Sequence, residues 1–292
     1  MILVFGSINI DLVVPVPGSP RPGETVLGGD YQLLPGGKGA NQALAACRAG
    51  GSVTMAGAVG EDAFAGAALE LLRRDGVDLA LVRQVERPTG LAAIMVGGSG
   101  ENLIAVASGA NAAVTAEFVP DDMLGPQTIV LCQMELPAAE TAALIRRAAR
   151  RGARCLLNLA PAVPIDRDLF GELHLLVANE AEAVSLGDNP AATARRLRQA
   201  FVVTRGAVGS TAFLRDGGRL EIPALAIDAV DTTAAGDTFI GVLAAGLDQG
   251  LVLQAALRRA SAAAGLACLA QGAQTGMPDK AAIDAAAERL PQ

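Results

Sequence analysis

The residues whose types and spacing best suit chemistry lie in the segment DTTAAGDT, from Asp231 to Thr238, which leads into the apolar run FIGVLAAGL. Small residues before a helix leave several N–H groups and the positive end of the helix dipole directed at one point, which favours an anion. Asp237 falls in the predicted first turn, where a carboxylate can accept a proton from a hydroxyl while the anion site holds a phosphoryl group. Phosphoryl transfer requires both functions. A helix N-cap is the alternative role for Asp237, but it leaves Asp231 and the small residues unexplained.

A second segment, PGGKGAN from Pro35 to Asn41, also stands directly before a predicted helix. Glycines let a ligand approach the backbone closely, and free N–H groups at a helix start favour an anionic or hydroxyl-rich ligand. Lys38 and Asn41 add side-chain donors. The spacing differs from that of a P-loop, and an ordinary tight turn into a helix is the alternative interpretation.

Two shorter segments follow predicted strands. The carboxylates of NEAE, from Asn179 to Glu182, could hold a hydrated Mg²⁺, which prefers oxygen ligands. A helix start with acidic residues in its first turn is the alternative. The glycine turn TRGAVG, from Thr204 to Gly209, could lie along a nucleotide or be a plain turn between strands. His174 lies inside an apolar run, where we expect a packed histidine rather than a catalytic one.

The elements that must position these segments alternate along the chain. Short Val, Ile and Leu runs alternate with Ala-rich amphipathic stretches, which is typical of an α/β fold with a mostly parallel, buried sheet. The predicted strands are Ile2–Phe5, Val53–Ala58, Thr128–Gln133, Arg154–Leu159, Leu173–Val177 and Phe201–Thr204. The predicted helices are Ala40–Ala49, Ala63–Asp75, Ala138–Arg151, Ala181–Leu186, Pro190–Gln199, Thr238–Asp248 and Leu251–Leu269. We expect Asn9 and Asp11 at the end of the first strand, where ligands bind in open α/β sheets; the alternative is that both only cap a turn.

Two regions depart from this alternation. Leu12–Pro35 is rich in Pro and Gly and contains the extended pieces TVLGG and DYQLL, and Gly90–Ala107 reads as a hairpin around the turn GGSGEN. Both are too short to be domains, so we expect a small sheet that covers one edge of a single domain spanning residues 1–292. A further hairpin, STAFLRDGGRLEIPAL, has Asp216–Gly218 as its predicted turn.

Composition excludes several classes of function. The 292 residues carry a formal charge of −7, with one His, no Trp and 3% aromatic residues. A multi-histidine metal site is therefore impossible, and nucleic-acid binding through stacked aromatics and sugar binding on Trp platforms are not expected. The longest uncharged stretch, Ala260–Pro278, holds polar residues and glycines and is a poor membrane span.

The cysteines and the N-terminus indicate the compartment. Cys47, Cys132, Cys155 and Cys268 are far apart and have mostly apolar neighbours, so we expect reduced thiols packed in the core. The start MILVFGSINID has no basic segment before an apolar stretch and does not read as a signal peptide. We therefore expect a cytoplasmic protein.

Seven segments in order resemble the pfkB carbohydrate kinase family, and within it the ribokinases. They are GSINID with PGETVLGGDYQLLPGGKGANQA, GENLIAVASGANAAV, CQMELP, LNLAPA, ANEAEA, VTRGAVG and VDTTAAGDTFIG. The match runs through essentially the whole chain. It implies a ribokinase-like, Rossmann-type three-layer α/β sandwich with a small β-sheet lid formed by residues 12–35 and 90–107.

The resemblance also implies roles for individual residues. The sugar hydroxyls would be bound by Asn9, Asp11, Gly37, Lys38, Asn41 and Glu135. Asp237 would take the proton from the O5 hydroxyl of the sugar, and Ala234, Ala235 and Gly236 would form the anion hole. The ATP site would be lined by Asn179, Thr204, Arg205, Gly206, Gly209, Gly236 and, near the adenine, Ser261. Glu182 would organise Mg²⁺ through water. A monovalent-cation loop, normally filled by K⁺, would comprise Asp231, Thr233, Ala267, Ala270, Gly272 and Gly276.

The residue chemistry suits this interpretation, with a few departures. Each hydroxyl of a polyol both donates and accepts, so Asp, Asn, Lys and Glu side chains suit such a substrate; for Glu135 the alternative is a helix-start acid before Pro137. Gly276 stands where ribokinases commonly have a serine near the cation, which weakens the expected site. Ser261 replaces a larger residue near the adenine. Arg205 places an additional cation by the nucleotide phosphates.

The expected function is ATP-dependent phosphorylation of D-ribose at O5, with Mg²⁺ and a monovalent cation as cofactors. The same fold could instead act on another sugar, a sugar acid or a nucleoside, although few aromatics are present for a base to stack on. A sugar-binding protein without catalysis is the alternative from another class. The expected partners are a sugar and ATP, with no nucleic acid or membrane, and the lid would pair two copies into a homodimer.

Overall fold

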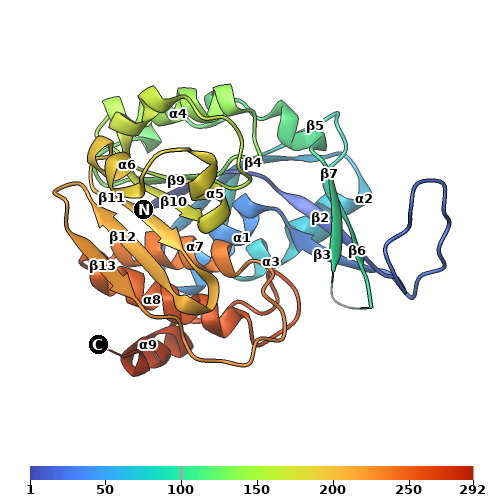
Figure 1. Cartoon of the computed structure of the whole chain (residues 1–292). Helices are drawn as coiled ribbons and strands as arrows, with labels where there is room; N and C mark the ends of the chain where they lie inside the picture. Colours follow the sequence, from blue (N-terminus) through green and yellow to red (C-terminus); the bar gives the residue numbers. More distant parts are fainter. Residues whose placement is uncertain (99–100, 292) are drawn as a thin grey trace.

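A large twisted sheet with helices on both faces forms the body of the molecule, and a smaller sheet projects from one side (Figure 1). The structure is a computed structural model that describes residues 1–98 and 101–291. Within these residues the large sheet has, in spatial order, β13 (Arg219–Ile222), β12 (Ser210–Leu214), β11 (Ala200–Thr204), β10 (Leu173–Asn179), β9 (Arg154–Asn158), β8 (Ile129–Cys132), β1 (Ile2–Phe5), β4 (Val53–Gly60) and β5 (Asp78–Val85). All neighbouring pairs are parallel except β11–β12 and β12–β13.

The helices occupy two layers around this sheet. They are α1 (Lys38–Arg48), α2 (Ala63–Ala68), α3 (Glu70–Arg74), α4 (Ala138–Arg150), α5 (Glu180–Ser185), α6 (Pro190–Arg196), α7 (Ala235–Asp248), α8 (Leu253–Ala267) and α9 (Lys280–Arg289). Short 3₁₀ turns occur at Gly109–Ala113, Ala116–Phe118, Asp121–Met123, Arg167–Glu172 and Gly206–Val208. The α/β three-layer prediction is confirmed.

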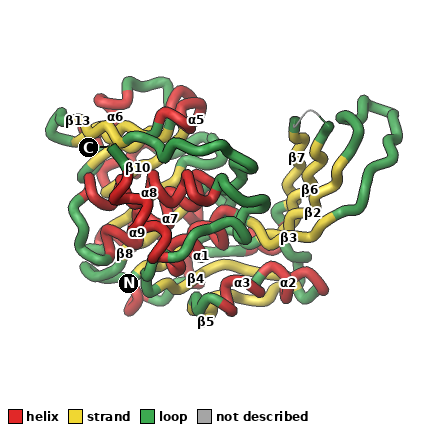
Figure 2. Tube along the Cα trace, turned by 90° about the horizontal axis from the view of Figure 1, so that it is seen from below, coloured by secondary structure: helices red, strands yellow, loops and turns green. Residues whose placement is uncertain are grey.

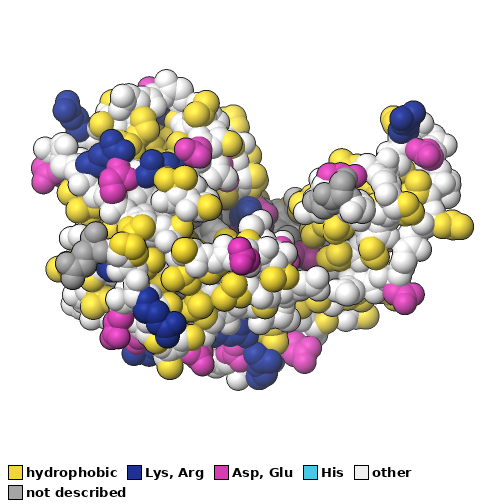
Figure 3. Space-filling model, turned by 60° about the horizontal axis from the view of Figure 1, so that its bottom comes forward, with side chains coloured by type: hydrophobic (Ala, Val, Ile, Leu, Met, Phe, Trp, Pro, Cys, Tyr) yellow, Lys and Arg dark blue, Asp and Glu magenta, His cyan; other side chains and the backbone are white. Residues whose placement is uncertain are grey.

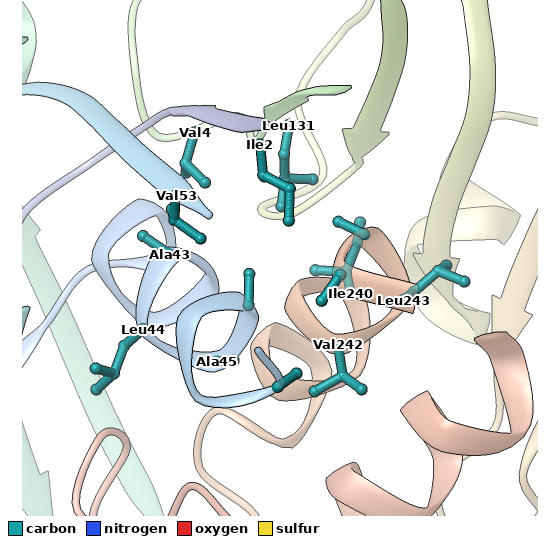
Figure 4. Close-up of a cluster of buried hydrophobic side chains, with 14 of the residues drawn as sticks. Ile2, Val4, Ala43, Leu44, Ala45, Val53, Leu131, Ile240, Val242 and Leu243 are labelled. Atoms are coloured by element: carbon teal, nitrogen blue, oxygen red, sulfur yellow. The ribbon is translucent and has the colours of Figure 1, made fainter. Parts of the chain in front are cut away.

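Strand β1 shows how the two layers share one sheet. Its side chains alternate between the faces: Ile2 and Val4 pack into one apolar core, and Leu3 and Phe5 into the other. In the first core, β1 lies over α1 and α7, which run side by side beneath it (Figure 4). Burial on both faces explains why the strand is a continuous apolar run rather than an alternating one.

The second sheet contains β3 (Gln32–Gly36), β2 (Asn9–Pro15), β6 (Gly90–Val96) and β7 (Asn102–Ala107), in that order. β2 pairs antiparallel with β3 and parallel with β6, and β6 pairs antiparallel with β7. This small sheet and the loop over residues 16–31 stand away from the main body (Figure 2). The predicted β6–β7 and β12–β13 hairpins are confirmed, although residues 99 and 100 of the GGSGEN turn lie outside the described part of the chain.

Several predicted elements need correction. The first strand ends at Phe5, and Asn9 and Asp11 instead open β2 of the small sheet. The predicted helix over residues 63–75 is two helices that meet at Leu69. TVLGG forms no strand, and both β5 and α9 were absent from the prediction. Helix α7 begins at Ala235, three residues before the predicted start.

Candidate active site

Two adjoining cavities lie at the carboxyl ends of the parallel strands. The larger, about 370 Å³, is lined by Thr204, Gly206, Gly209 and Ser261 among others. The smaller, about 200 Å³, is lined by residues that include Lys38, Asn179, Glu182, Ala234 and Asp237. Thr204 and Gly236 line both cavities, so the two are continuous at the start of α7. The surface is hollowed where the main body faces the small sheet (Figure 3).

The start of α7 is set by an unusual backbone conformation. Ala234 is the N-cap and has φ 59° and ψ 13°, the left-handed region that an alanine adopts at a cost of roughly 1–2 kcal/mol. The first N–H groups of an α-helix have no acceptors within the helix, and here the Ala235 N–H donates to the Thr232 carbonyl oxygen at 3.3 Å. Gly236 has open space where a Cβ would stand. A helix N-terminus favours a negatively charged group nearby.

Asp237 is in the first turn of α7 and is 6% exposed. Its Oδ2 accepts a hydrogen bond from Asn41 Nδ2 at 3.0 Å, and its Oδ1 accepts one from Gln42 Nε2 at 2.9 Å. The N-cap alternative is wrong, because Ala234 holds that position and the carboxylate faces α1 instead. A buried, hydrogen-bonded carboxylate beside a helix N-terminus is suited to accept a proton from a bound hydroxyl.

Helix α1 reaches this position because two glycines allow close approach. A Cβ on Gly37, which has φ 88°, would lie 2.8 Å from the backbone N of Asn9, and one on Gly39 would lie 2.5 Å from the backbone N of Ser7. The tight turn thus packs directly on the connection between β1 and β2. Lys38 follows Gly37 and lines the cavity, where the Asp237 carboxylate raises the pKa of Lys38 more than burial lowers it.

Asp11 and Asn9 lie on β2, opposite β3. Asn9 is 3% exposed, and its Oδ1 accepts a hydrogen bond from Asn111 Nδ2 at 2.7 Å. Asp11 lies over Gly36, where a Cβ would come within 2.3 Å of its carboxylate. Burial raises the pKa of Asp11 to about 7, and the carboxylates of Glu135 and Asp237 add to the effect of burial while Lys38 opposes it.

Glu135 closes the same cluster from the end of β8. Its Oε2 accepts hydrogen bonds from Ser7 Oγ at 2.5 Å and from the Lys38 backbone N–H at 3.1 Å. Helix α4 begins only at Ala138, with Pro137 as its N-cap and no side-chain capping bond, so the helix-start alternative for Glu135 is wrong. Glu135 ties the turn before α1 to the strand end of β8.

Asn179 and Glu182 form a capping box at the start of α5. Asn179 Oδ1 accepts from the Glu182 N–H, and Glu182 Oε2 accepts from the Asn179 N–H, each at 2.8 Å. The acidic helix-start alternative therefore describes part of their role. Glu182 also lines the smaller cavity, and burial raises the pKa of its carboxyl although Lys38 opposes this shift. Its oxygens are of the kind that Mg²⁺ prefers.

The larger cavity is shaped by the loop after β11 and by α8. Ser261 donates to the Pro223 carbonyl at 2.6 Å. The Arg205 side chain does not reach toward the cavity as a free cation: its Nη2 donates to Glu221 Oε2 at 2.6 Å. Most of the residues gathered here are apolar, with Ala224, Ile227 and Phe239 among them, which is suited to a flat, largely apolar ring.

The predicted cation residues also lie together. The two carboxylate oxygens of Asp231 accept from the Thr233 and Gly272 N–H groups, each at 2.9 Å. A Cβ on Gly276 would lie 3.0 Å from the Ala267 carbonyl oxygen and 3.3 Å from that of Ala270, so two carbonyls converge on this glycine. Such oxygens suit a hard monovalent cation, and Gly276 supplies no side-chain ligand to it. In the described ranges, no three His, Cys, Asp or Glu side chains form a metal-binding group.

The remaining reactive side chains lie elsewhere. His174 on β10 accepts from the Cys155 N–H at 3.3 Å, and burial lowers its pKa to about 4. The four cysteines are free thiols, and Cys47 alone of them is partly exposed. The prediction of packed, unpaired thiols is confirmed. No helix in residues 1–98 and 101–291 is long and apolar enough to cross a membrane.

Four polar residues of the site were not singled out from the sequence. Ser7 and Asn111 hold Glu135 and Asn9, Gln42 contacts Asp237, and Asn158 lines the smaller cavity. Each belongs to a segment that drew attention for another reason, namely GSINID, SGANAA, GANQA and LNLAPA. The sequence feature that could have identified them is a polar residue beside a glycine turn or at the end of an apolar run.

Comparisons with known proteins show the family of the chain. The model of the pfkB family carbohydrate kinases matches residues 1–280. The chain is 35% identical to a ribokinase of Schizosaccharomyces pombe, over 97% of this chain and 96% of that one. A ribokinase structure from Thermotoga maritima matches with TM-score 0.91 at 30% identity over 99% of each chain. A structure of Arabidopsis thaliana ribokinase complexed with ribose and ATP matches with TM-score 0.88 at 29% identity over 98% of each chain. The chain belongs to the pfkB family of carbohydrate kinases.

Proposed function

We propose that the chain transfers the γ-phosphoryl group of ATP to the O5 hydroxyl of D-ribose. The observation that carries this proposal is the position of Asp237, between a cluster of polar side chains and the start of α7. Asn9, Asp11, Lys38, Asn41 and Glu135 converge there from β2, from α1 and from the segment that follows β8. A relative whose structure is complexed with ribose and ATP supports ribose as the sugar and ATP as the phosphoryl donor.

In this mechanism Asp237 accepts the proton of the O5 hydroxyl as that oxygen attacks the γ-phosphorus. Ala234, Ala235 and Gly236 hold the transferring group at the start of α7, where N–H groups and the helix dipole stabilise the developing negative charge. Lys38 lines the same cavity and adds a positive charge. The polar cluster fixes the sugar, with Gly37 allowing close approach of the backbone and Asp11 and Glu135 making the strongest bonds to hydroxyls.

The nucleotide would occupy the larger cavity. Thr204, Gly206 and Gly209 would lie along it, with Asn179 toward the phosphates and Ser261 toward the adenine. Mg²⁺ would neutralise phosphate charge, and Glu182 would hold it through water. Arg205 would contribute to the phosphates only through the field of its ion pair with Glu221. The small sheet would close over the sugar and pair two copies of the chain.

A coupled assay of ADP release over a panel of pentoses, hexoses and nucleosides tests the substrate. We expect ribose to give the highest kcat/KM. Turnover with another compound and none with ribose would show a different kinase of the same fold. Calorimetric binding of ribose without any ADP release would show a binding protein that lacks catalysis.

The cation loop has a separate test. Asp231, Thr233, Ala267, Ala270, Gly272 and Gly276 would hold K⁺ beside the anion hole, chiefly through backbone carbonyls. We expect turnover to be higher in potassium than in sodium-free choline buffer at equal ionic strength. Equal rates in the two buffers would contradict a working cation site. A Gly276→Ser variant, which restores a side-chain oxygen, should need less K⁺ for half-maximal activation.

A further inference from the structure

Three buried glutamines lie around the contact between α1 and the Asp237 carboxylate, and none of them lines either cavity. Gln42 is fully buried, and Gln133 and Gln274 are each 1% exposed. We propose that Gln42 is a positioning residue for Asp237, and that Gln133 acts through Gln42 to hold it in the orientation that donates to the carboxylate. The inference rests on the proposed function in that it takes Asp237 as the base.

The oxygens of an ionised carboxylate only accept hydrogen bonds, so Gln42 must present its amide nitrogen to Asp237. The Gln42 Nε2 to Asp237 Oδ1 distance is 2.9 Å. An amide turned by 180° would place its oxygen against the carboxylate, which is repulsive. The orientation of one buried amide therefore decides whether the base is held or displaced.

A second amide fixes that orientation. Gln133 Nε2 donates to Gln42 Oε1 at 2.7 Å, from the residue that follows β8. On the other side, Gln274 Nε2 donates to Asn41 Oδ1 at 3.1 Å, and Asn41 Nδ2 donates to Asp237. Gln133, Gln42, Asp237, Asn41 and Gln274 thus form an amide chain in which every amide dipole points its N–H toward the carboxylate.

The ends of the amide chain show that it is not arranged for stability alone. Among the described residues, the buried Oε1 atoms of Gln133 and Gln274 have no hydrogen-bond partner. A buried acceptor without a partner costs free energy, and such costs are concentrated where a structure serves function. The amide chain leaves the oxygens at its two ends without hydrogen bonds, while both carboxylate oxygens at its centre accept one.

Two partners of Asp237 differ in access. Asn41 is 5% exposed and is also assigned to the sugar, so its substitution would mix binding and catalysis. Gln42 is sealed under α7, because a Cβ on Gly241 of that helix would lie only 2.5 Å from the Gln42 carbonyl oxygen. Loss of the Gln42 amide should therefore change kcat and leave the affinity for sugar nearly unchanged.

The test uses Gln42→Met and Gln133→Met, which keep the volume and remove the amide. We expect Gln42→Met to lower kcat about 10- to 100-fold, the range for one hydrogen bond to a charged group, with sugar KM changed less than about threefold. Gln133→Met should lower kcat less, and the double variant should be no slower than Gln42→Met alone. Gln249→Met is the matched control, since Gln249 bonds the far end of α1 at Ala49 O and should leave kcat unchanged.

The outcomes separate this inference from the proposed function. Three results would overturn the positioning role. They are a double variant whose loss of kcat is the product of the two single losses, a raised KM at unchanged kcat for Gln42→Met, and a kcat of Gln42→Met within twofold of wild type. If Gln42→Met does not fold, Gln133→Met still tests the proposal, because an unchanged kcat in that variant would show that Gln133 does not act through Gln42. Asp237→Asn is measured in parallel: a large loss with Asp237→Asn but none with Gln42→Met rejects only the positioning role, whereas no loss with Asp237→Asn rejects the base itself.

Discussion

Charge is crowded around Lys38, and this crowding decides how the sugar site responds to pH. Asp11, Glu135 and Asp237 all act on the lysine, and burial, followed by repulsion from Glu135 and Asp237, raises the pKa of Asp11 to about 7. In the proposed mechanism, a neutral Asp11 would lose its charge-assisted bonds to sugar hydroxyls. Proposed sugar binding therefore depends on a carboxyl whose pKa lies near neutral pH.

We expect the KM for ribose to rise as the pH falls below about 7, as Asp11 takes up its proton. An Asp11→Asn variant should have a higher KM that no longer changes across this range. Steady-state kinetics between about pH 5.5 and 8.5 measure this, with Asp168→Asn, which replaces an exposed carboxylate far from the cavities, as the control. A wild-type KM that is flat in this range would contradict the role of Asp11.

The same shift has a consequence for stability. Because the pKa of Asp11 is raised from 3.8 to about 7 in the folded protein, its contribution is fully present below about pH 4 and is lost as the pH rises to about 7. Asp11→Asn should therefore be more stable than wild type at pH 8, by on the order of 2–4 kcal/mol. It should show no gain in stability at about pH 4. Urea unfolding at these two pH values checks the sign.

At the scale of elements, the site depends on how closely α1 and α7 approach. Gly241 on α7 has no room for a Cβ, which would lie 2.5 Å from the Gln42 carbonyl oxygen and 2.8 Å from the Ala45 Cβ. Asn41 and Gln42 reach Asp237 only because the helices touch here. The same contact that packs the core therefore sets the position of the Asp237 carboxylate.

We expect Gly241→Ala to lower the free energy of unfolding by about 1–3 kcal/mol, as overpacking does, and to lower kcat by moving α7 away from α1. Denaturant unfolding and steady-state kinetics measure the two effects. Gly66→Ala is the matched control, because a Cβ on that helical glycine meets nothing within 4 Å. A Gly241→Ala protein with wild-type stability and kcat would show that this contact does not position the base.

The elements also show what could be predicted from the sequence and what could not. The buried strands β1, β4 and β8 to β11 and the helices with clear periodicity were found because an apolar pattern marks them. Strand β5 was missed because its residues, Asp78–Val85, alternate weakly and lie at the sheet edge. The prediction placed Asn9 and Asp11 on the first strand because no turn signal separates GSI from NID. The change to the second sheet becomes visible only in the structure, where Gly37 packs against the backbone of Asn9.

The residues of the site likewise include some that could be predicted from the sequence and some that could not. The residues that meet at the cavities were recognisable because small residues before helices have a local signature. Gln42, Gln133 and Gln274 were not, since a lone amide becomes informative only when three distant segments bring it against a carboxylate. The same holds for Arg205, whose expected role changes because Glu221 on β13 pairs with it.

At the scale of the whole molecule, the small sheet carries apolar side chains that the body does not cover. Tyr31, Leu33, Leu103, Ile104 and Val106 are between 41% and 64% exposed on or beside its strands. We propose that a second copy of the chain covers this surface while the sheet closes over the sugar. The pairing would explain exposed apolar residues on a short, projecting sheet.

We expect Ile104→Glu to weaken this pairing, because it places a charge in the proposed interface, and to raise the KM for ribose by about threefold or more by loosening the lid. Light scattering after size-exclusion chromatography measures the mass, and kinetics measure KM. Val252→Glu, at a 73% exposed position of the main body, is the control. An unchanged mass and KM for Ile104→Glu would place the interface elsewhere.

The net charge of −7 does not oppose nucleotide binding, because phosphate is met locally. The helix start at Ala235, the glycine turns and Lys38 supply the positive field within the cavities. The one histidine, His174 on β10, lines neither cavity, and the proposed mechanism assigns the base to a carboxylate. That mechanism depends on Asp237.

The kcat of Asp237→Asn tests that dependence most directly. The asparagine keeps the size of the side chain and a hydrogen-bond acceptor, but it cannot take the proton of the O5 hydroxyl. The account predicts that kcat falls by at least about 10²-fold, with ribose and ATP still bound in calorimetry. A variant that turns over ribose at close to the wild-type rate would contradict it.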